Sequence, residues 1–428
     1  MNPRFSVVIP TRNRPALARQ SVSRLLTQTF NDFEVIILEN SDSPALQDLE
    51  AIDRRIRVIP SNRVLSMPDN WERALDVVQG EYLLFTSDKD MLLPFALYEL
   101  DTAIRQHPGD IFTYRKAIYP EPETVLHFQE CSGGSAIYST KPILRSWFQQ
   151  VRHYHNAPMV YNSAVSRGLI LSIRSINGRF FAGLCPDVSS GVILCASTDH
   201  YVLVDRILSV GYFGPWSIGY STGLFGRKAA TASFASEFSN DPFRSEGIVF
   251  SVSGSIAQTL LACKRAWPYL FESYSIYWPN YIANALEELA GYRANNANTV
   301  SETRTLFSGI GQLYSLSNFM CGISLRFSRR LRCLAPSRIW QRLRCSFPVK
   351  YILPPHLRLR RYWNNIIQRF LPMYSLSLQL DLRAGRPPEF LPPYRNSHTS
   401  SLEEACHFLA SCMGVTKNTC FASDSHDQ

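Results

Sequence analysis

Glycine is missing from the start of this chain: there is none between Met1 and Gly80. A dinucleotide-binding fold of the dehydrogenase type needs glycines in its first strand-to-helix turn, because they let the backbone approach a pyrophosphate closely. The corresponding turn here reads PTRNRP. This absence argues against a site for NAD or NADP.

Metal-binding thiol patterns and long apolar runs are also missing. The ten cysteines form no C-x-x-C pair and have no histidine at zinc-ligand spacing, so we expect reduced, mostly buried thiols. No stretch approaches the ~20 apolar residues that cross a bilayer. The first residues show no charged-then-apolar leader. We therefore expect a cytoplasmic protein that does not span a membrane.

Acidic residues are absent between Ile323 and Phe370, where twelve lysines or arginines occur. The positive charges of this basic segment (residues 323–370) outnumber the net charge of the whole chain, which is +9. Its charges alternate with Trp, Phe and Leu, a composition typical of a helix on anionic lipid. Nucleic acid attracts the same charge, and a solvated face of a helical domain is the structural alternative. We favour peripheral binding to the inner face of the membrane, and rank nucleic acid last because no nucleic-acid motif accompanies the charge.

What is present indicates two domains. In the first half short apolar runs alternate with amphipathic stretches, which predicts an α/β domain over residues 1–235 with a mostly parallel sheet and helices on both faces. Mostly helical segments follow, and predict a helical C-terminal domain over residues 236–417. Residues 418–428 are expected to form a disordered tail.

The apolar runs and their boundaries predict individual elements. The expected strands are Phe5–Ile9, Phe33–Leu38, Arg57–Ile59 and Glu81–Thr86. The expected helices are Ala16–Thr29, Pro68–Gln79, Leu93–Gln106, Gly254–Ala266, Tyr281–Tyr292 and Leu402–Cys412.

Two carboxylates with a lysine between them follow the buried strand in YLLFTSDKD, residues 82–90. Ligands of parallel α/β sheets collect at the carboxyl ends of the strands, so Asp88, Lys89 and Asp90 lie where a charged substrate would be handled. The structural alternative is that an aspartate after a strand only caps a turn or a helix.

The turn after the first strand offers a second set of polar groups. Thr11 and Asn13 can form hydrogen bonds with a base or a ribose, and Arg12 and Arg14 can bring guanidinium charge to a phosphate. This turn and the acidic turn are expected at the same edge of the sheet.

Four segments, within residues 5 to about 205, carry a resemblance to a known family. In chain order they are FSVVIPTRNRP, LLTQTFNDFEVIILENSDSP, MPDNWERALDVVQGEYLLF and TSDKDMLLPFAL. Together they resemble the family 2 glycosyltransferases of the GT-A fold. The resemblance implies a GT-A domain that moves a sugar, with inversion, from a nucleotide-diphosphate-sugar donor to a glycan or lipid-linked acceptor, in polysaccharide or glycolipid assembly.

Donor-binding residues follow from the resemblance, position by position. Those implied are Pro10, Thr11, Asn13, Arg14, Glu39, Asn40, Asn70, Asp88, Lys89 and Asp90. Two departures weaken the match. Glu39 and Asn40 stand where the family usually has two aspartates, and Asp69 precedes Asn70 where the family often has an arginine.

The largest departure concerns the metal. Counting back from Pro94, Lys89 occupies the position that ligates Mg²⁺ or Mn²⁺ in the family. Asp88 and Asp90 could form a metal-binding pair shifted by one residue. Alternatively Lys89, helped by the arginines of the first turn, takes the metal's place against the donor diphosphate, since unit charges ~4 Å apart attract by about 4 kcal/mol at an effective dielectric of about 20. In a third case the site no longer transfers sugar, and the protein is a nucleotide-sugar-binding or scaffold homologue. We favour weak or absent metal dependence and expect no other cofactor.

The resemblance also implies a catalytic base well after the acidic turn. Asp187, in GLCPDVSSGVILCA, is the candidate, and an ordinary helix cap is its structural alternative. Asp199 and Asp205 are kept in reserve, although Asp205 with the arginine that follows it suggests an ion pair on a strand. His153 and His155 are weaker candidates for the acceptor side.

Overall fold

A computed structural model describes most of the chain up to residue 334 and one short segment beyond it. The described residues are 2–120, 125–129, 131–151, 157–214, 217, 232–241, 243–291, 296–334 and 395–398. Several expectations lie outside them: the helix Leu402–Cys412, the tail 418–428, His153, His155 and the basic segment after residue 334. In the part of the chain that is described, no helix is long and apolar enough to cross a membrane.

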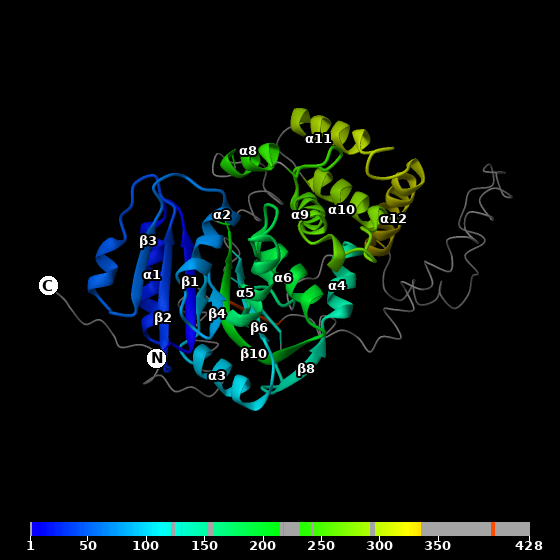
Figure 1. Ribbon diagram of the computed structural model, residues 1–428. Helices are drawn as coiled ribbons and strands as arrows, with labels where there is room; N and C mark the ends of the chain where they lie inside the picture. The colour runs from blue at the N-terminus through cyan, green and yellow to red at the C-terminus, as the bar shows by residue number, and fades with distance from the viewer. Residues whose placement is uncertain are drawn as a thin grey trace, which may run out of the picture.

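One sheet of 11 strands runs through the described residues (Figure 1). At one end four parallel strands lie in the order β3-β2-β1-β4. They are β1 (Phe5–Thr11), β2 (Phe33–Glu39), β3 (Ile56–Pro60) and β4 (Tyr82–Phe85). All four predicted strands are confirmed. Every residue of β1 and β2 is buried, which explains why their sequences are continuous apolar runs.

Beyond β4 the sheet is mixed. β9 (Ser163–Ser166) is antiparallel to both β4 and β6 (Ile111–Pro120), whereas the long β10 (His200–Phe213) is parallel to β6. The remaining strands form antiparallel pairs: β5 (Met91–Leu92) and β8 (Ser135–Ser139) with β10, β7 (Val125–Phe128) with β6, and β11 (Arg395–His398) with β7. The mostly parallel sheet that we expected therefore describes the first four strands, and the rest of the sheet is mixed.

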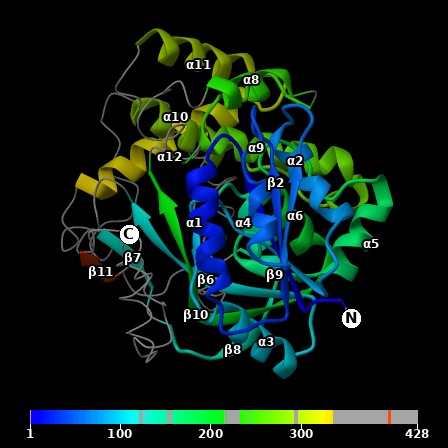
Figure 2. The ribbon, with the colours of Figure 1, turned by 90° about the vertical axis from the view of Figure 1, so that its left-hand side faces the viewer.

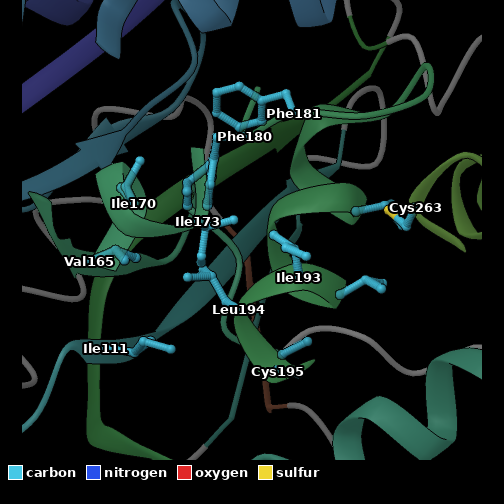
Figure 3. Close-up of a cluster of buried hydrophobic side chains, with 14 of the residues drawn as sticks. Ile111, Val165, Ile170, Ile173, Phe180, Phe181, Ile193, Leu194, Cys195 and Cys263 are labelled. Carbon is cyan, nitrogen blue, oxygen red and sulfur yellow. The ribbon is translucent and has the colours of Figure 1, made fainter. Parts of the chain in front are cut away.

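Helices cover both faces of the sheet, as predicted. α1 (Pro15–Leu26) and α3 (Ala96–Gln106) contribute buried side chains to the core on one face. The other face carries α2 (Met67–Glu72), α4 (Lys141–Phe148), α5 (Arg167–Asn177) and α6 (Pro186–Ser197). Figure 3 shows the core of this second face, where apolar side chains of α5, α6, β6 and β9 meet Phe180, Phe181 and Cys263. This core fixes the position of α6.

The helix expected over Pro68–Gln79 is shorter in the structure. α2 ends at Glu72, and a 3₁₀ turn, η2 (Arg73–Asp76), follows it. The chain must leave the helix because Gly80 packs directly against β1. A Cβ atom at Gly80 would lie 2.4 Å from the Ser6 nitrogen, and the Ser6 hydroxyl accepts a hydrogen bond from the Gly80 N–H at 2.8 Å.

A helical region follows the sheet, as predicted. It contains α8 (Ala232–Asn240), α9 (Val252–Ala266), α10 (Trp278–Gly291), α11 (Asn296–Ser308) and α12 (Leu316–Leu334). Figures 1 and 2 show these helices gathered at the top of the molecule. Side chains of α9 join the same core as α6, so packing continues across residue 235, and the domain division there stays a prediction. Arg12, in the turn after β1, lies 3.8 Å from Glu237 of α8, which places α8 near the carboxyl end of β1.

Candidate active site

Asp88 joins the turns that follow β1 and β4. Its side chain is fully buried. The Thr11 hydroxyl donates a hydrogen bond to Asp88 Oδ2 at 2.8 Å, and Arg14 Nε lies 2.9 Å from the same oxygen. Burial raises the pKa of Asp88, and the Arg14 charge, the Thr11 hydrogen bond and the Lys89 charge only partly offset this. The two turns therefore meet at one edge of the sheet, as the sequence predicted.

Asp90 is held by the mixed half of the sheet. Lys116 Nζ, on β6, lies 2.9 Å from Asp90 Oδ2, and the backbone N–H of Tyr212, on β10, donates to Oδ1 at 3.0 Å. Burial alone would raise the pKa of Asp90. The charges of Lys116 and Lys89 and these hydrogen bonds outweigh burial, and the pKa is lowered. The ionised form of Asp90 is thus stabilised by contacts with β6 and β10.

Lys89 lies between these two acids and is half-buried. Its Nζ donates a hydrogen bond to the Ser87 hydroxyl at 2.9 Å. Its positive charge favours ionisation of Asp88, Asp90 and also Asp187. The charge of Lys89 therefore acts on all three candidate acids.

Asp187 stands in the first turn of α6, directly after Pro186. The rest of the helix is apolar and mostly buried, so it anchors this turn firmly. Burial raises the pKa of Asp187, against hydrogen bonds from backbone N–H groups at the start of the helix and against the charges of Lys89 and Lys116. The side chain keeps part of its surface open to solvent. Asp187 therefore interacts with the helix start, as a cap would, and also has the raised basicity that suits a general base.

Two residues at this site were missed by sequence reasoning, Lys116 and Tyr161. The Tyr161 ring centroid lies 5.6 Å from Lys116 Nζ and 4.7 Å from the ring centroid of Trp71. Burial and then the charges of Asp187, Asp90 and Asp88 raise the pKa of Tyr161, so the phenol responds to all three acids. A lysine inside the strand IFTYRKAIYP was the available signal, because a lysine is rarely buried without a partner.

The first turn contacts the loop after β2. Asn13 has a positive φ of 55°, which asparagine tolerates better than most residues. Its side chain donates to Asp42 Oδ2 at 2.8 Å and accepts from the Asp42 N–H at 3.0 Å. Pro10 is buried within β1. These residues lie at the predicted edge, and their contacts with a donor stay predictions.

Three further donor-site candidates form hydrogen bonds with nearby segments of the chain. Glu39 accepts hydrogen bonds from the N–H groups of residues 45 and 46. The Asn40 amide exchanges two hydrogen bonds of 2.9 Å with the backbone of Leu65. Asn70 is buried and accepts a hydrogen bond from Arg73 at 3.0 Å. All three order the loops at the carboxyl end of β2, and their donor contacts also stay predictions.

The two reserve acids are engaged elsewhere. Asp199 is exposed and lies 2.9 Å from Lys141. Asp205 does form an ion pair on a strand, but its partner is Arg115 on the neighbouring β6. Arg206 points to another acid, with its Nε 3.3 Å from Glu99. Asp187, on which the charges of Lys89 and Lys116 act, thus stays the candidate base.

The acidic turn fits a divalent metal poorly. Among the described residues there is no group of three or more His, Cys, Asp or Glu side chains that could hold a metal ion. Asp88 is paired with Arg14 and Asp90 with Lys116. A hard cation that takes carboxylate ligands would have to compete with these built-in cations.

Comparison with known proteins identifies the first part of the chain. Residues 6–169 match the family model "Glycosyl transferase family 2". The chain is 32% identical over 103 residues to a GalNAc(5)-diNAcBac-PP-undecaprenol beta-1,3-glucosyltransferase of Campylobacter jejuni, covering 23% of this chain and 33% of that protein. It is 29% identical over 108 residues to a PGL/p-HBAD biosynthesis glycosyltransferase of Mycobacterium bovis, covering 24% of this chain and 40% of that protein. The matched stretch thus spans well under half of either relative.

A structural neighbour is TarS 1-349 of S. aureus, solved in complex with UDP. The superposition covers 76% of this chain and 92% of that chain, with a TM-score of 0.41 and 14% sequence identity. The family match covers β1 to β9 and, apart from Phe5, includes all four segments that carry the sequence resemblance, and the fold is the GT-A-like α/β sheet with a helical C-terminal region. Residues 6–169, well under half of this chain, thus carry its match to glycosyl transferase family 2.

Proposed function

We propose that this protein transfers a sugar, with inversion, from a nucleotide-diphosphate-sugar donor to an acceptor hydroxyl. The observation that supports the proposal is the pairing of Asp88 with Arg14 and of Asp90 with Lys116 on either side of Lys89, whose charge also acts on Asp187. A cation that acts on a carboxylate of raised pKa suits a reaction that releases an anion and removes a proton.

The reaction is a single displacement at the anomeric carbon. The acceptor oxygen forms a bond to this carbon while the bond to the diphosphate oxygen breaks, and the sugar carbon inverts. The hydroxyl proton passes to Asp187. The leaving diphosphate keeps the electron pair of the broken bond, and Lys89 stabilises its charge.

We further propose that transfer depends weakly or not at all on a divalent metal. The ion pairs Asp88–Arg14 and Asp90–Lys116 support this, because both carboxylates already have positive partners. One lysine supplies half the formal charge of Mg²⁺ or Mn²⁺. The nearby guanidinium of Arg14 adds to the positive potential.

A panel of nucleotide-sugars tests both proposals. Binding and transfer are measured with Mn²⁺ and with EDTA for the wild type and for Lys89→Asp. We expect wild-type turnover to persist in EDTA, and Lys89→Asp to be at least tenfold slower there and to gain activity with Mn²⁺. A wild type that requires metal contradicts the lysine model. Nucleotide binding without turnover of any donor supports the alternative, a nucleotide-sugar-binding or scaffold homologue.

The acceptor that we propose is a glycan or a lipid-linked glycan, and we place the protein peripherally on the inner face of the membrane. The C. jejuni relative is named for an undecaprenol-linked substrate. In this chain α12 carries an apolar stripe on its exposed side, formed by Leu316, Met320, Ile323 and Phe327. The spacing of four, three and four residues puts them on one face of the helix. The opposite side packs on α10, with Gly322 against Ile282.

The charge of α12 favours anionic lipid as the occupant of this stripe. The helix contains no acidic residue, and its second half carries Arg326, Arg329, Arg330 and Arg332, of which Arg329 pairs with Glu287 of α10 at 3.6 Å. An apolar stripe beside basic charge is the pattern of a helix that lies in the membrane interface.

Vesicle flotation tests the membrane proposal with the full chain. Met320→Gln combined with Phe327→Gln should lower binding to phosphatidylglycerol vesicles at least tenfold, because each buried apolar side chain contributes about 1.5 kcal/mol or more. The matched control is Ile52→Gln with Tyr269→Gln, two exposed apolar residues outside α12. Equal vesicle binding by both double variants refutes the proposal that the stripe contacts the membrane. Steeply salt-dependent RNA binding with no vesicle preference would favour nucleic acid instead.

A further inference from the structure

We propose that Lys116 is a positioning residue of this reaction: it acts as a second built-in cation that fixes Asp90 and keeps Asp187 able to accept a proton. The inference rests on the proposed function and extends it from the acidic turn to β6. Lys89 is the cation expected at the diphosphate, whereas Lys116 acts through the two carboxylates.

Contacts with β10 and the acidic turn define the position of the Lys116 side chain. Lys116 lies opposite Ser209 in the β6–β10 pairing, and its Nζ reaches Asp90 Oδ2 at 2.9 Å. Gly211 on β10 leaves room for it. A Cβ atom at Gly211 would lie 3.1 Å from Lys116 Cε and 3.4 Å from Nζ. A larger residue there would crowd the ammonium group away from its carboxylate.

Aromatic side chains lie on another side of Lys116. Lys116 Nζ lies 5.6 Å from the centroid of the Tyr161 ring, within the range of a cation–π contact. Tyr161 is itself held by Trp71, with ring centroids 4.7 Å apart and an interplanar angle of 81°. The Tyr114 hydroxyl donates to the Tyr161 carbonyl at 3.3 Å. Lys116 therefore has a defined position, which a residue with an electrostatic role requires.

A chain of contacts connects this place to Asp187. The Val160 N–H donates to the Ser190 hydroxyl at 3.3 Å, and that hydroxyl donates to the Asp187 carbonyl at 2.7 Å. The segment that carries Tyr161 is thus tied to the first turn of α6. A shift in this segment would also move the candidate base.

The charged and titratable groups around Asp187 come from several elements. They are Lys89 after β4, Lys116 on β6, Tyr161 before β9 and Cys185 before α6. Burial raises the pKa of Asp187, while the two lysines act in the opposite direction. Loss of Lys116 should therefore raise this pKa further and reduce the deprotonated fraction at a given pH.

The test is the pH profile of kcat/KM for three variants. For Lys116→Met we expect the acidic limb to move to higher pH by about one unit, with about tenfold less activity on that limb and recovery at higher pH. Lys116→Arg should keep most of the wild-type profile. Lys141→Met is the matched control, since it removes an exposed lysine that pairs with Asp199. An equal loss at every pH would reveal a merely structural role and overturn the inference.

Thermal unfolding gives a second readout that needs no substrate. Lys116→Met leaves the buried Asp90 without its nearest counter-ion, so the loss in Tm should grow as the pH rises from 4 to 8. Adding Asp90→Asn should remove this pH dependence. A pH-independent loss in Tm overturns the proposed pairing.

The two levels of proposal can fail separately. Absence of transfer by the wild type with every donor overturns the proposed function and this inference together. Transfer by the wild type, with no change in the acidic limb of Lys116→Met, overturns the inference alone.

Discussion

The two halves of the sheet use their polar residues differently. In the parallel half Glu39, Asn40 and Asn13 bond to neighbouring loops and give the turns their shape. The mixed half supplies Lys116 from β6, and the connection before β9 supplies Tyr161. The acidic turn after β4 lies between them, with Asp88 tied to the first half and Asp90 to the second. The parallel half therefore carries the family signature, and the mixed half sets the charge at the candidate site.

The largest expected effect tests whether the reacting carboxylate lies beyond the parallel half. Asp187→Asn keeps the size and polarity of the side chain but cannot take a proton, so we expect transfer to fall by about 10²- to 10⁴-fold. Steady-state kinetics with the best donor measure this.

The matched control is Asp199→Asn, because Asp199 is an exposed acid of a surface ion pair. It should leave kcat within about twofold of the wild type, since such pairs contribute little. Comparable activity of the two variants would show that Asp187 is only a helix cap.

The same contrast explains what the sequence could predict. β1, β2 and β4 are apolar runs whose neighbours in the sheet follow from parallel α/β topology, so the edge with Thr11 and Asp88 was predictable. Asp187 was proposed because the family resemblance implies a base well after the acidic turn, and its role stays a prediction. Lys116 and Tyr161 were not found, because only the β6–β10 pairing and the packing of the segment before β9 bring them to the acids.

The errors have similar physical causes. The end of α2 was misplaced because the close approach of Gly80 to β1 is a tertiary requirement, which helix propensity does not report. Asp205 was correctly seen as part of an ion pair, yet its partner is Arg115 across the sheet and not the adjacent Arg206. Both residues lie at the irregularity of the β6–β10 register between Val204 and Ile207, which the sequence does not reveal.

An effect of intermediate size on stability tests the close packing of the parallel half. Gly80→Ala would place a Cβ atom 2.4 Å from the backbone nitrogen of Ser6, so β1 or the turn must shift. We expect a loss of about 1–3 kcal/mol in the free energy of unfolding, as for other overpacked sites. Urea unfolding followed by circular dichroism measures it.

Gly168→Ala is the control for this substitution. Gly168 lies in α5, and a Cβ atom there would meet nothing within 4 Å. Alanine in a helix is favoured over glycine by about 0.5–1 kcal/mol, so this variant should be no less stable than the wild type. Equal losses at both positions would contradict the close approach of Gly80 to β1.

The smallest expected effect concerns the two acids of the turn. Their pKa values are shifted in opposite directions from the ordinary value of an aspartate. The pKa of Asp90 is lowered, so its ionised form stabilises the fold above the pKa of the unfolded state, and this contribution is lost as the pH falls through the folded pKa. The pKa of Asp88 is raised, so the fold loses stability as the pH rises through that value. Removing each charge should therefore have opposite consequences. As the pH rises, the Tm of the wild type should increase relative to that of Asp90→Asn. Over the same range, the Tm of the wild type should decrease relative to that of Asp88→Asn. Slopes of the same sign for both variants would mean that the two halves of the sheet do not hold these carboxylates differently.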